Sequence, residues 1–198
     1  MTSRFISLLR SQGASGKKAL VPLVASLTAV VLLSHLCSAE RIEYRGLYTN
    51  QDYGFTVRIP RGLVAVGATA GAPNHGFVLN LAEGSQIEVS AFYVNPDDHV
   101  PFPSELPRHF PVRTPEGEIQ RATFTRLGGM RAQRTLTAVV TPRGATRVTD
   151  KVVAVRNDKD GNPYIRYTVT LMSESKPHSV GTKVFSSVLR SFQLTSVH

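Results

Sequence analysis

The amino-acid sequence predicts a domain of the α+β class, in which a C-terminal helix packs on an antiparallel β-sheet. Two observations support this prediction. Between residues 55 and 172, apolar and polar side chains alternate in short segments separated by turn residues, which is typical of strands with one buried face. From residue 178 onward, apolar side chains recur at intervals of three and four, which is typical of an amphipathic helix.

The first 39 residues are organised as a signal peptide. Their only charged residues are basic, namely Arg4, Arg10, Lys17 and Lys18. A mostly apolar run from residue 19 to 36 follows, and the small residues Cys37 and Ala39 occupy positions −3 and −1 of a cleavage bond. We therefore predict cleavage after Ala39 and export of a single domain, residues 40–198, to the periplasm or the medium, with no membrane span left.

Two other fates of this segment remain open. The apolar run approaches the roughly 20 residues that cross a bilayer, so an uncleaved signal would anchor the domain in the membrane. Lipidation of Cys37 is the other fate, although the preceding Leu36 differs from the small residue that lipid-attachment sites favour.

Cleavage would also change the charge and the thiol content. The formal net charge falls from +9 to +5 when the four basic residues of the signal are removed, and the only cysteine, Cys37, is lost with them. The remaining chain has no run of adjacent Lys or Arg residues, whereas tracking of nucleic-acid phosphates requires clustered basic side chains. A nucleic-acid partner is therefore not predicted.

The predicted strands follow in order along the exported chain. A polar lead, residues 40–46, comes first, and the strand that follows ends at Pro60, which cannot donate to a β-ladder. The predicted strands are residues 55–60, 76–81, 86–94, 120–127, 131–140, 146–156 and 164–172. The predicted turns and loops are residues 67–74, 82–85, 128–129, 141–144 and 157–162, which are rich in small or turn-forming residues.

The last element is a helix predicted for residues 178–190. Its apolar stripe should cover the sheet face formed by Tyr167, Val169 and Leu171, because these side chains alternate with polar ones along the preceding strand. This arrangement completes the predicted sheet-plus-helix architecture.

Residues 95–115 form a proline-rich segment that holds six of the twelve prolines. Such a density excludes sustained helix or central strand and predicts a long loop. Phe102, Leu106 and Phe110 recur within it at four-residue spacing, with Arg108 beside them. Aromatic side chains with basic neighbours are typical of a partner-binding surface, and the alternative is that the apolar side chains close one end of the core.

Both ends of the exported chain resemble the PsbP-like and Mog1-like domains of bacterial exported proteins. The opening reads Tyr48-Thr49-Asn50, then Asp52-Tyr53-Gly54-Phe55, then Ile59-Pro60, and the close combines a tyrosine-containing strand, a helix and Ser191-Phe192. The chain departs from the pattern after Pro60, where Arg61-Gly62-Leu63 replaces the usual Gly-Trp. The resemblance implies a fold used in noncatalytic assembly and binding roles, and it supplies no catalytic residues.

No catalytic, cofactor or metal motif appears in the sequence. The best local cluster, Asp97-Asp98-His99, combines two carboxylates with an imidazole and would suit a divalent ion or acid–base chemistry. We favour the explanation that it is a polar loop start, because metal sites need several convergent ligands. We therefore predict a noncatalytic exported module of the cell envelope that binds a partner protein or a small ligand, without a cofactor. The alternative is an envelope hydrolase or metal-binding protein that uses this cluster.

Overall fold

The computed structural model describes residues 41–69, 75–95, 105–115, 117–142, 144–156, 164–174 and 179–195. All of them belong to one compact unit, Glu40–His198. The predicted signal peptide and the predicted loop at 157–162 lie outside the described residues.

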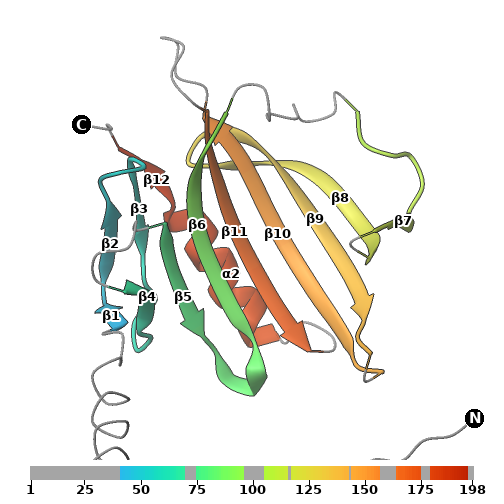
Figure 1. Ribbon diagram of the computed structural model, residues 1–198, viewed down its shortest axis with the longest axis horizontal. Coiled ribbons are helices and arrows are strands. Elements are labelled where there is room, and N and C mark those ends of the chain that lie inside the picture. The colour runs from blue at the N-terminus through green and yellow to red at the C-terminus, as the bar shows by residue number, and fades with distance from the viewer. Residues whose placement is uncertain are drawn as a thin grey trace, which may run out of the picture. The chain divides into compact units, whose positions relative to one another are not determined.

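A nine-stranded antiparallel sheet dominates the unit (Figure 1). In spatial order its strands are β1 (Arg41–Tyr44), β4 (Ala65–Thr69), β5 (Gly76–Asn80), β6 (Gln86–Val94), β11 (Tyr164–Glu174), β10 (Thr146–Arg156), β9 (Met130–Val140), β8 (Gly117–Leu127) and β7 (Val112–Thr114). A second sheet has the order β12 (Gln193–Leu194), β3 (Phe55–Arg58) and β2 (Leu47–Asn50). The remaining elements are the helix α2 (Ser179–Ser191) and a short 3-10 turn, η1 (Ala82–Gly84).

The predicted α+β class is wrong. Strands make up 63% of the described residues, and α2, with 13 residues, is the one α-helix among them. The spacing of apolar residues identified the helix correctly. It could not show that nine strands join into one sheet, so the predicted class overstated the share of helix in the fold. The fold is sheet-dominated, and the PsbP/Mog1-like assignment, which rested on sequence motifs at both ends of residues 40–198, is not supported.

The large sheet has two chemically different faces, which we call inner and outer. On the inner face, Val89, Val169 and Val152 are neighbours on β6, β11 and β10, and all three are fully buried. The outer face carries the alternate positions, such as Thr170 and Lys151. This alternation follows from the two-residue repeat of a strand.

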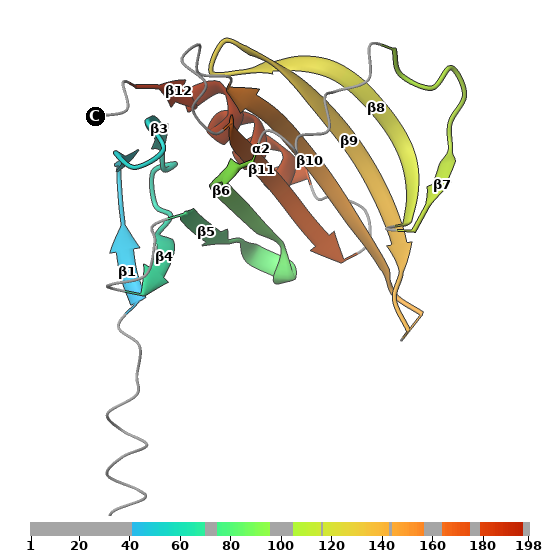
Figure 2. The same ribbon diagram turned by 45° about the horizontal axis from the view of Figure 1, so that its top comes forward.

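Helix α2 packs against β11 of the large sheet and β3 of the small sheet. Its side chains Phe185 and Val188 are fully buried beside Tyr167, Val169 and Leu171 of the inner face, which confirms the predicted covering of that face. Figure 2 shows β8, β9 and β10 curving away from the helix. The core therefore lies under α2, and the far strands extend beyond it.

The opening sequence motif builds the turn between β2 and β3. The Asn50 amide nitrogen donates to the Tyr48 hydroxyl at 3.0 Å, and its amide oxygen accepts from the Tyr53 backbone N–H at 3.0 Å. Gly54 has φ of 61°, a backbone conformation that glycine adopts without strain. The next residue, Phe55, stacks on Phe192 with ring centroids 5.2 Å apart. These residues therefore have a structural role, because they join β2 and β3 to the segment that follows α2.

Five of the observed strands were not predicted, namely β1, β2, β4, β7 and β12. β1 lies in the supposed polar lead, and β4 includes the first residues of the supposed loop at 67–74. The two pair with each other, so that Tyr44 lies opposite Ala65. Glycine suits position 67 of β4 because the Tyr44 ring packs closely there, and a Cβ would lie 2.5 Å from that ring. Tertiary pairing, rather than local propensity, decides these strands.

Candidate functional site

The outer face of the large sheet contains a groove of about 440 Å³. Its lining residues are Thr114, Pro115, Ile119, Gln133, Thr135, Thr137, Lys151 and Val153. They come from β8, β9, β10 and the end of the proline-rich segment, which supplies Thr114 and Pro115. The volume falls within the range of small-molecule sites, about 300–1,000 Å³.

Strand register brings the polar groups of this groove together. Thr135 lies directly opposite Lys151, and Gln133 lies opposite Val153 on the same pair of strands. Along the other edge of β9, Thr137 pairs with Ile119 of β8. The lining therefore combines one ammonium group, one amide and three threonine side chains with apolar surface, and it contains no carboxylate. Of the three threonine hydroxyls, that of Thr114 already donates to the Gly117 carbonyl at 2.9 Å.

Of the residues predicted for partner binding, the three that the structure describes, Leu106, Arg108 and Phe110, do not line this groove. Arg108 is exposed, Leu106 and Phe110 are half-buried, and Phe102 lies outside the described residues. Neither Leu106 nor Phe110 belongs to the buried core, so these two side chains do not close it. The end of the same segment does contribute to the groove, through Thr114 and Pro115.

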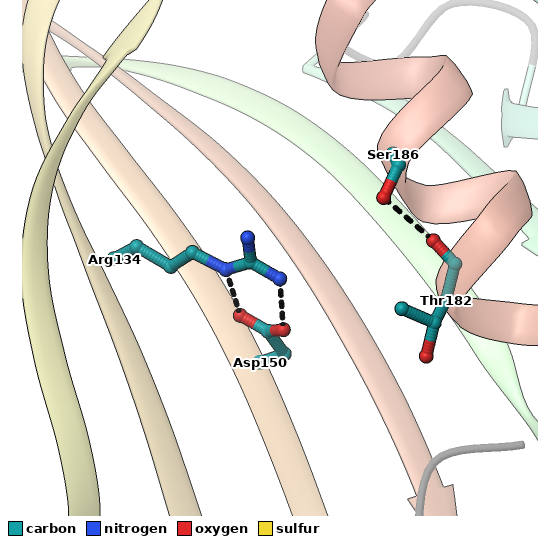
Figure 3. Close-up of polar contacts among 4 residues, drawn as sticks. All are labelled: Arg134, Asp150, Thr182 and Ser186. Carbon is teal, nitrogen blue, oxygen red and sulfur yellow. Dashed lines mark hydrogen bonds and ion pairs between the residues drawn. The ribbon is translucent and has the colours of Figure 1, made fainter. Parts of the chain in front are cut away.

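The inner face carries an ion pair between Arg134 of β9 and Asp150 of β10 (Figure 3). Arg134 Nε lies 2.8 Å from Asp150 Oδ1, and Arg134 Nη2 lies 2.6 Å from Asp150 Oδ2, so the pair is bidentate. The hydrogen bond to Asp150 raises the pKa of Arg134 above its usual value, against a smaller opposing effect of burial. The guanidinium also lies 5.6 Å from the centre of the Phe185 ring of α2.

Arg134 and Asp150 were not among the predicted site residues. The alternation of side chains along β10 could have indicated the pair. Asp150 shares the strand face of Val152 and Ala154, both fully buried, so a carboxylate at that position needs a partner. Figure 3 shows the pair on the same side of the sheet as Thr182 and Ser186 of α2. Ser186 donates back to the Thr182 carbonyl at 2.8 Å, so its hydroxyl is engaged within the helix. The two members of the pair satisfy each other, and the pair acts as a structural contact.

A third set of polar side chains, Tyr53 and His75, lies beside the C-terminal half of β6. Nδ1 of His75 is 2.7 Å from the Tyr53 hydroxyl and 3.1 Å from the Ala91 carbonyl oxygen. The His75 ring stacks on Phe92 with centroids 4.5 Å apart, beside a mainly apolar hollow of about 270 Å³. The Tyr53 side chain is only 4% exposed, and burial is the main cause that raises the pKa of its phenol above 10.0.

This perturbed phenol makes the stability depend on pH. Because the folded state holds the Tyr53 proton more tightly than the unfolded state, its contribution is complete below about pH 10 and is lost as the pH rises through the folded pKa. We expect Tyr53→Phe to cost about 1 kcal/mol at about pH 8, where the hydrogen bond to His75 is intact. The difference from the wild type should shrink at about pH 11, as measured by urea denaturation at both values. A difference that stays constant with pH would contradict this expectation.

Asp97, Asp98 and His99 lie outside the described residues. Within the described part of the chain, no three His, Cys, Asp or Glu side chains are grouped to hold a metal ion. None of the helices in the described ranges is long and apolar enough to cross a membrane.

Comparison with known proteins gives a likeness of fold. No family model matches the sequence, so the resemblance to PsbP-like and Mog1-like domains has no support from this comparison. No curated protein matches it either. The crystal structure of LpqN, a protein involved in cell envelope biogenesis of Mycobacterium tuberculosis, aligns with 83% of this chain and 97% of its own at a TM-score of 0.51. With 12% sequence identity, the likeness shows that the two chains share a similar fold.

Proposed function

We propose that this protein is a noncatalytic exported module of the cell envelope, and that it binds a partner protein or a small ligand in the outer-face groove. The groove itself is the observation that carries the proposal. It is a hollow of about 440 Å³ whose polar groups come mainly from neighbouring strands. A hollow with some apolar surface and a few convergent polar groups is the usual form of a binding site.

The chemistry of the lining favours binding over catalysis. Lys151 is the one charged side chain among the eight residues that line the groove, and no carboxylate, imidazole or thiol accompanies it. General acid–base and nucleophilic mechanisms need such groups within hydrogen-bond reach of one another.

Two independent features support a place in the envelope. The first is the signal-like organisation of residues 1–39, with a basic start, an apolar run and small residues before the cleavage bond. The second is the fold shared with LpqN, which is involved in cell envelope biogenesis. A shared fold alone does not transfer a function, so the envelope role needs its own test.

Filling the groove tests the proposal. Thr135 is half-buried and lines the groove, and a tyrosine there would occupy the hollow while remaining a favourable strand residue. Thr168→Tyr is the matched control, because Thr168 is a half-buried outer-face residue on β11 that does not line the groove. The wild type and both variants would be crosslinked in the native envelope and captured. Bound proteins and small molecules would then be identified by mass spectrometry.

We expect Thr135→Tyr to lose at least one molecule that both the wild type and Thr168→Tyr retain. Thermal transitions of the three proteins, measured by circular dichroism, would show that the loss is not due to unfolding. If the two variants capture the same molecules as the wild type, the groove is not the binding site.

A further inference from the structure

We propose that the outer-face groove binds the oxyanion of a small polar ligand, a phosphate or a carboxylate group, with Lys151 as its charged contact. This inference rests on the proposed function and specifies its ligand class. It follows from the distribution of charge over the two faces of the sheet and from the donors that surround Lys151.

Strand register divides the charged residues of β6, β8, β9, β10 and β11 between the two faces. The outer face has five cations and two acids, which are Arg126, Arg131, Arg147, Lys151 and Arg166 against Glu88 and Glu174. The inner face has three cations and two acids, which are Arg121, Arg134 and Arg156 against Glu118 and Asp150. On these five strands, the excess of positive charge is therefore three on the outer face and one on the inner face, and Arg113 of β7, opposite Glu118, adds one cation to the inner face.

This charge asymmetry affects ligand binding, because the groove opens on the outer face, which is the more positive of the two. Arg134 on the inner face is neutralised by Asp150, whereas Lys151 forms no ion pair among the described residues. Lys151 is also half-buried, so its charge is less screened by solvent than that of a fully exposed lysine. A site of this kind favours an anion over a neutral or cationic group.

The neighbours of Lys151 suit the oxygens of such an anion. Thr135 lies directly across from it on β9, and Gln133 and Thr137 occupy the adjacent outer positions of the same strand. Hydroxyl and amide groups can donate to oxyanion oxygens, and a hydrogen bond from a charged donor is about twice as strong as one between neutral groups. The apolar side chains Ile119 and Val153, which also line the groove, can contact the uncharged part of the ligand.

Calorimetric titration of the purified protein tests the ligand class. The probes are glucuronate and glucose 6-phosphate, and neutral glucose is the matched control for both. Vesicles of phosphatidylglycerol, compared with vesicles of phosphatidylcholine in a flotation assay, show whether the source of the anion is a lipid headgroup. Each assay is repeated with Lys151→Gln and with Arg166→Gln, which removes one cation from the same face outside the groove.

We expect at least one anionic probe to bind, with glucose at least about tenfold weaker. Lys151→Gln should weaken the binding about tenfold, since losing a charge-assisted hydrogen bond has about that effect, and Arg166→Gln should change it less than about twofold. Binding that both variants weaken equally would overturn the proposal, because it would reflect the diffuse charge of the face. Absence of binding by every anionic probe would also overturn it.

The failure of this inference can be distinguished from failure of the proposed function. If Thr135→Tyr removes a captured molecule but no anion binds at Lys151, the groove is a binding site for a different ligand class. If Thr135→Tyr removes nothing from the captured set, the groove is not the site, and the proposed function and this inference fail together.

Discussion

Replacing Gly76 with alanine is expected to destabilise the domain by about 4 kcal/mol or more, a large part of the roughly 5–15 kcal/mol that stabilises a typical domain. Gly76 begins β5 with φ of +146°, which side chains other than glycine rarely adopt. A Cβ at this position would lie 1.8 Å from the Val89 carbonyl oxygen. Because the contact is with backbone, β5 and β6 would have to separate to relieve it. Urea denaturation followed by circular dichroism measures the loss.

Gly46→Ala is the matched control for this experiment. Gly46 also has a positive φ, +72°, but a Cβ there would meet no atom within 4 Å. Its substitution should therefore cost only the conformational strain, about 1–2 kcal/mol. If Gly76→Ala were no more destabilising than Gly46→Ala, the close approach of β5 and β6 at Val89 would be refuted.

Removing Asp150 is expected to have the second-largest effect. Asp150→Ala leaves the Arg134 guanidinium beside Phe185 without its bidentate partner, in a region where water reaches only part of the side chain. Breaking a buried pair on one side costs about 3–5 kcal/mol. Since the Arg134 side chain is 29% exposed and the Asp150 side chain is 9% exposed, solvent screening reduces the expected loss to about 2–3 kcal/mol, which urea denaturation measures.

Two further variants separate the lost pair from other effects. Arg134→Met combined with Asp150→Leu removes both charges, and it should recover most of the lost stability. Glu43→Ala removes one member of an exposed pair, in which Arg45 and Glu43 are 3.5 Å apart, and it should change stability by less than about 0.5 kcal/mol. A double variant as unstable as Asp150→Ala would show that the carboxylate matters for a reason other than its pairing with Arg134.

Local patterns predicted the individual elements well where one side of a strand is buried. The observed bounds of β6 and β10 are those expected from their alternating side chains, and α2 is shifted by one residue from its prediction. No such pattern marks β4, whose residues Ala65–Thr69 include Gly67 and lack a strong strand preference. Pairing with β1 and β5 stabilises this segment, and neither pairing is visible in a local window.

The candidate groove could not be predicted because its members are distant in sequence. Thr114, Thr135 and Lys151 share one hollow only because β7, β8, β9 and β10 pair in a particular register. A shift of one residue in that register would turn Lys151 to the inner face. The proline-rich segment does contribute to the groove, but through its end at Thr114 and Pro115 rather than through Leu106, Arg108 or Phe110.

By itself, the sequence determined where most strands and the helix lie, because the spacing of apolar side chains along a segment reflects the burial of one face. It also predicts a signal peptide over residues 1–39, since a basic start followed by an apolar run is visible in the sequence without any tertiary contact. The tertiary structure decided the size of the sheet, and with it the fold class, because strand count and strand order depend on contacts between distant segments. It also decided that Arg134 meets Asp150 and that Thr135 lies opposite Lys151, since strand register determines which residues of neighbouring strands come together.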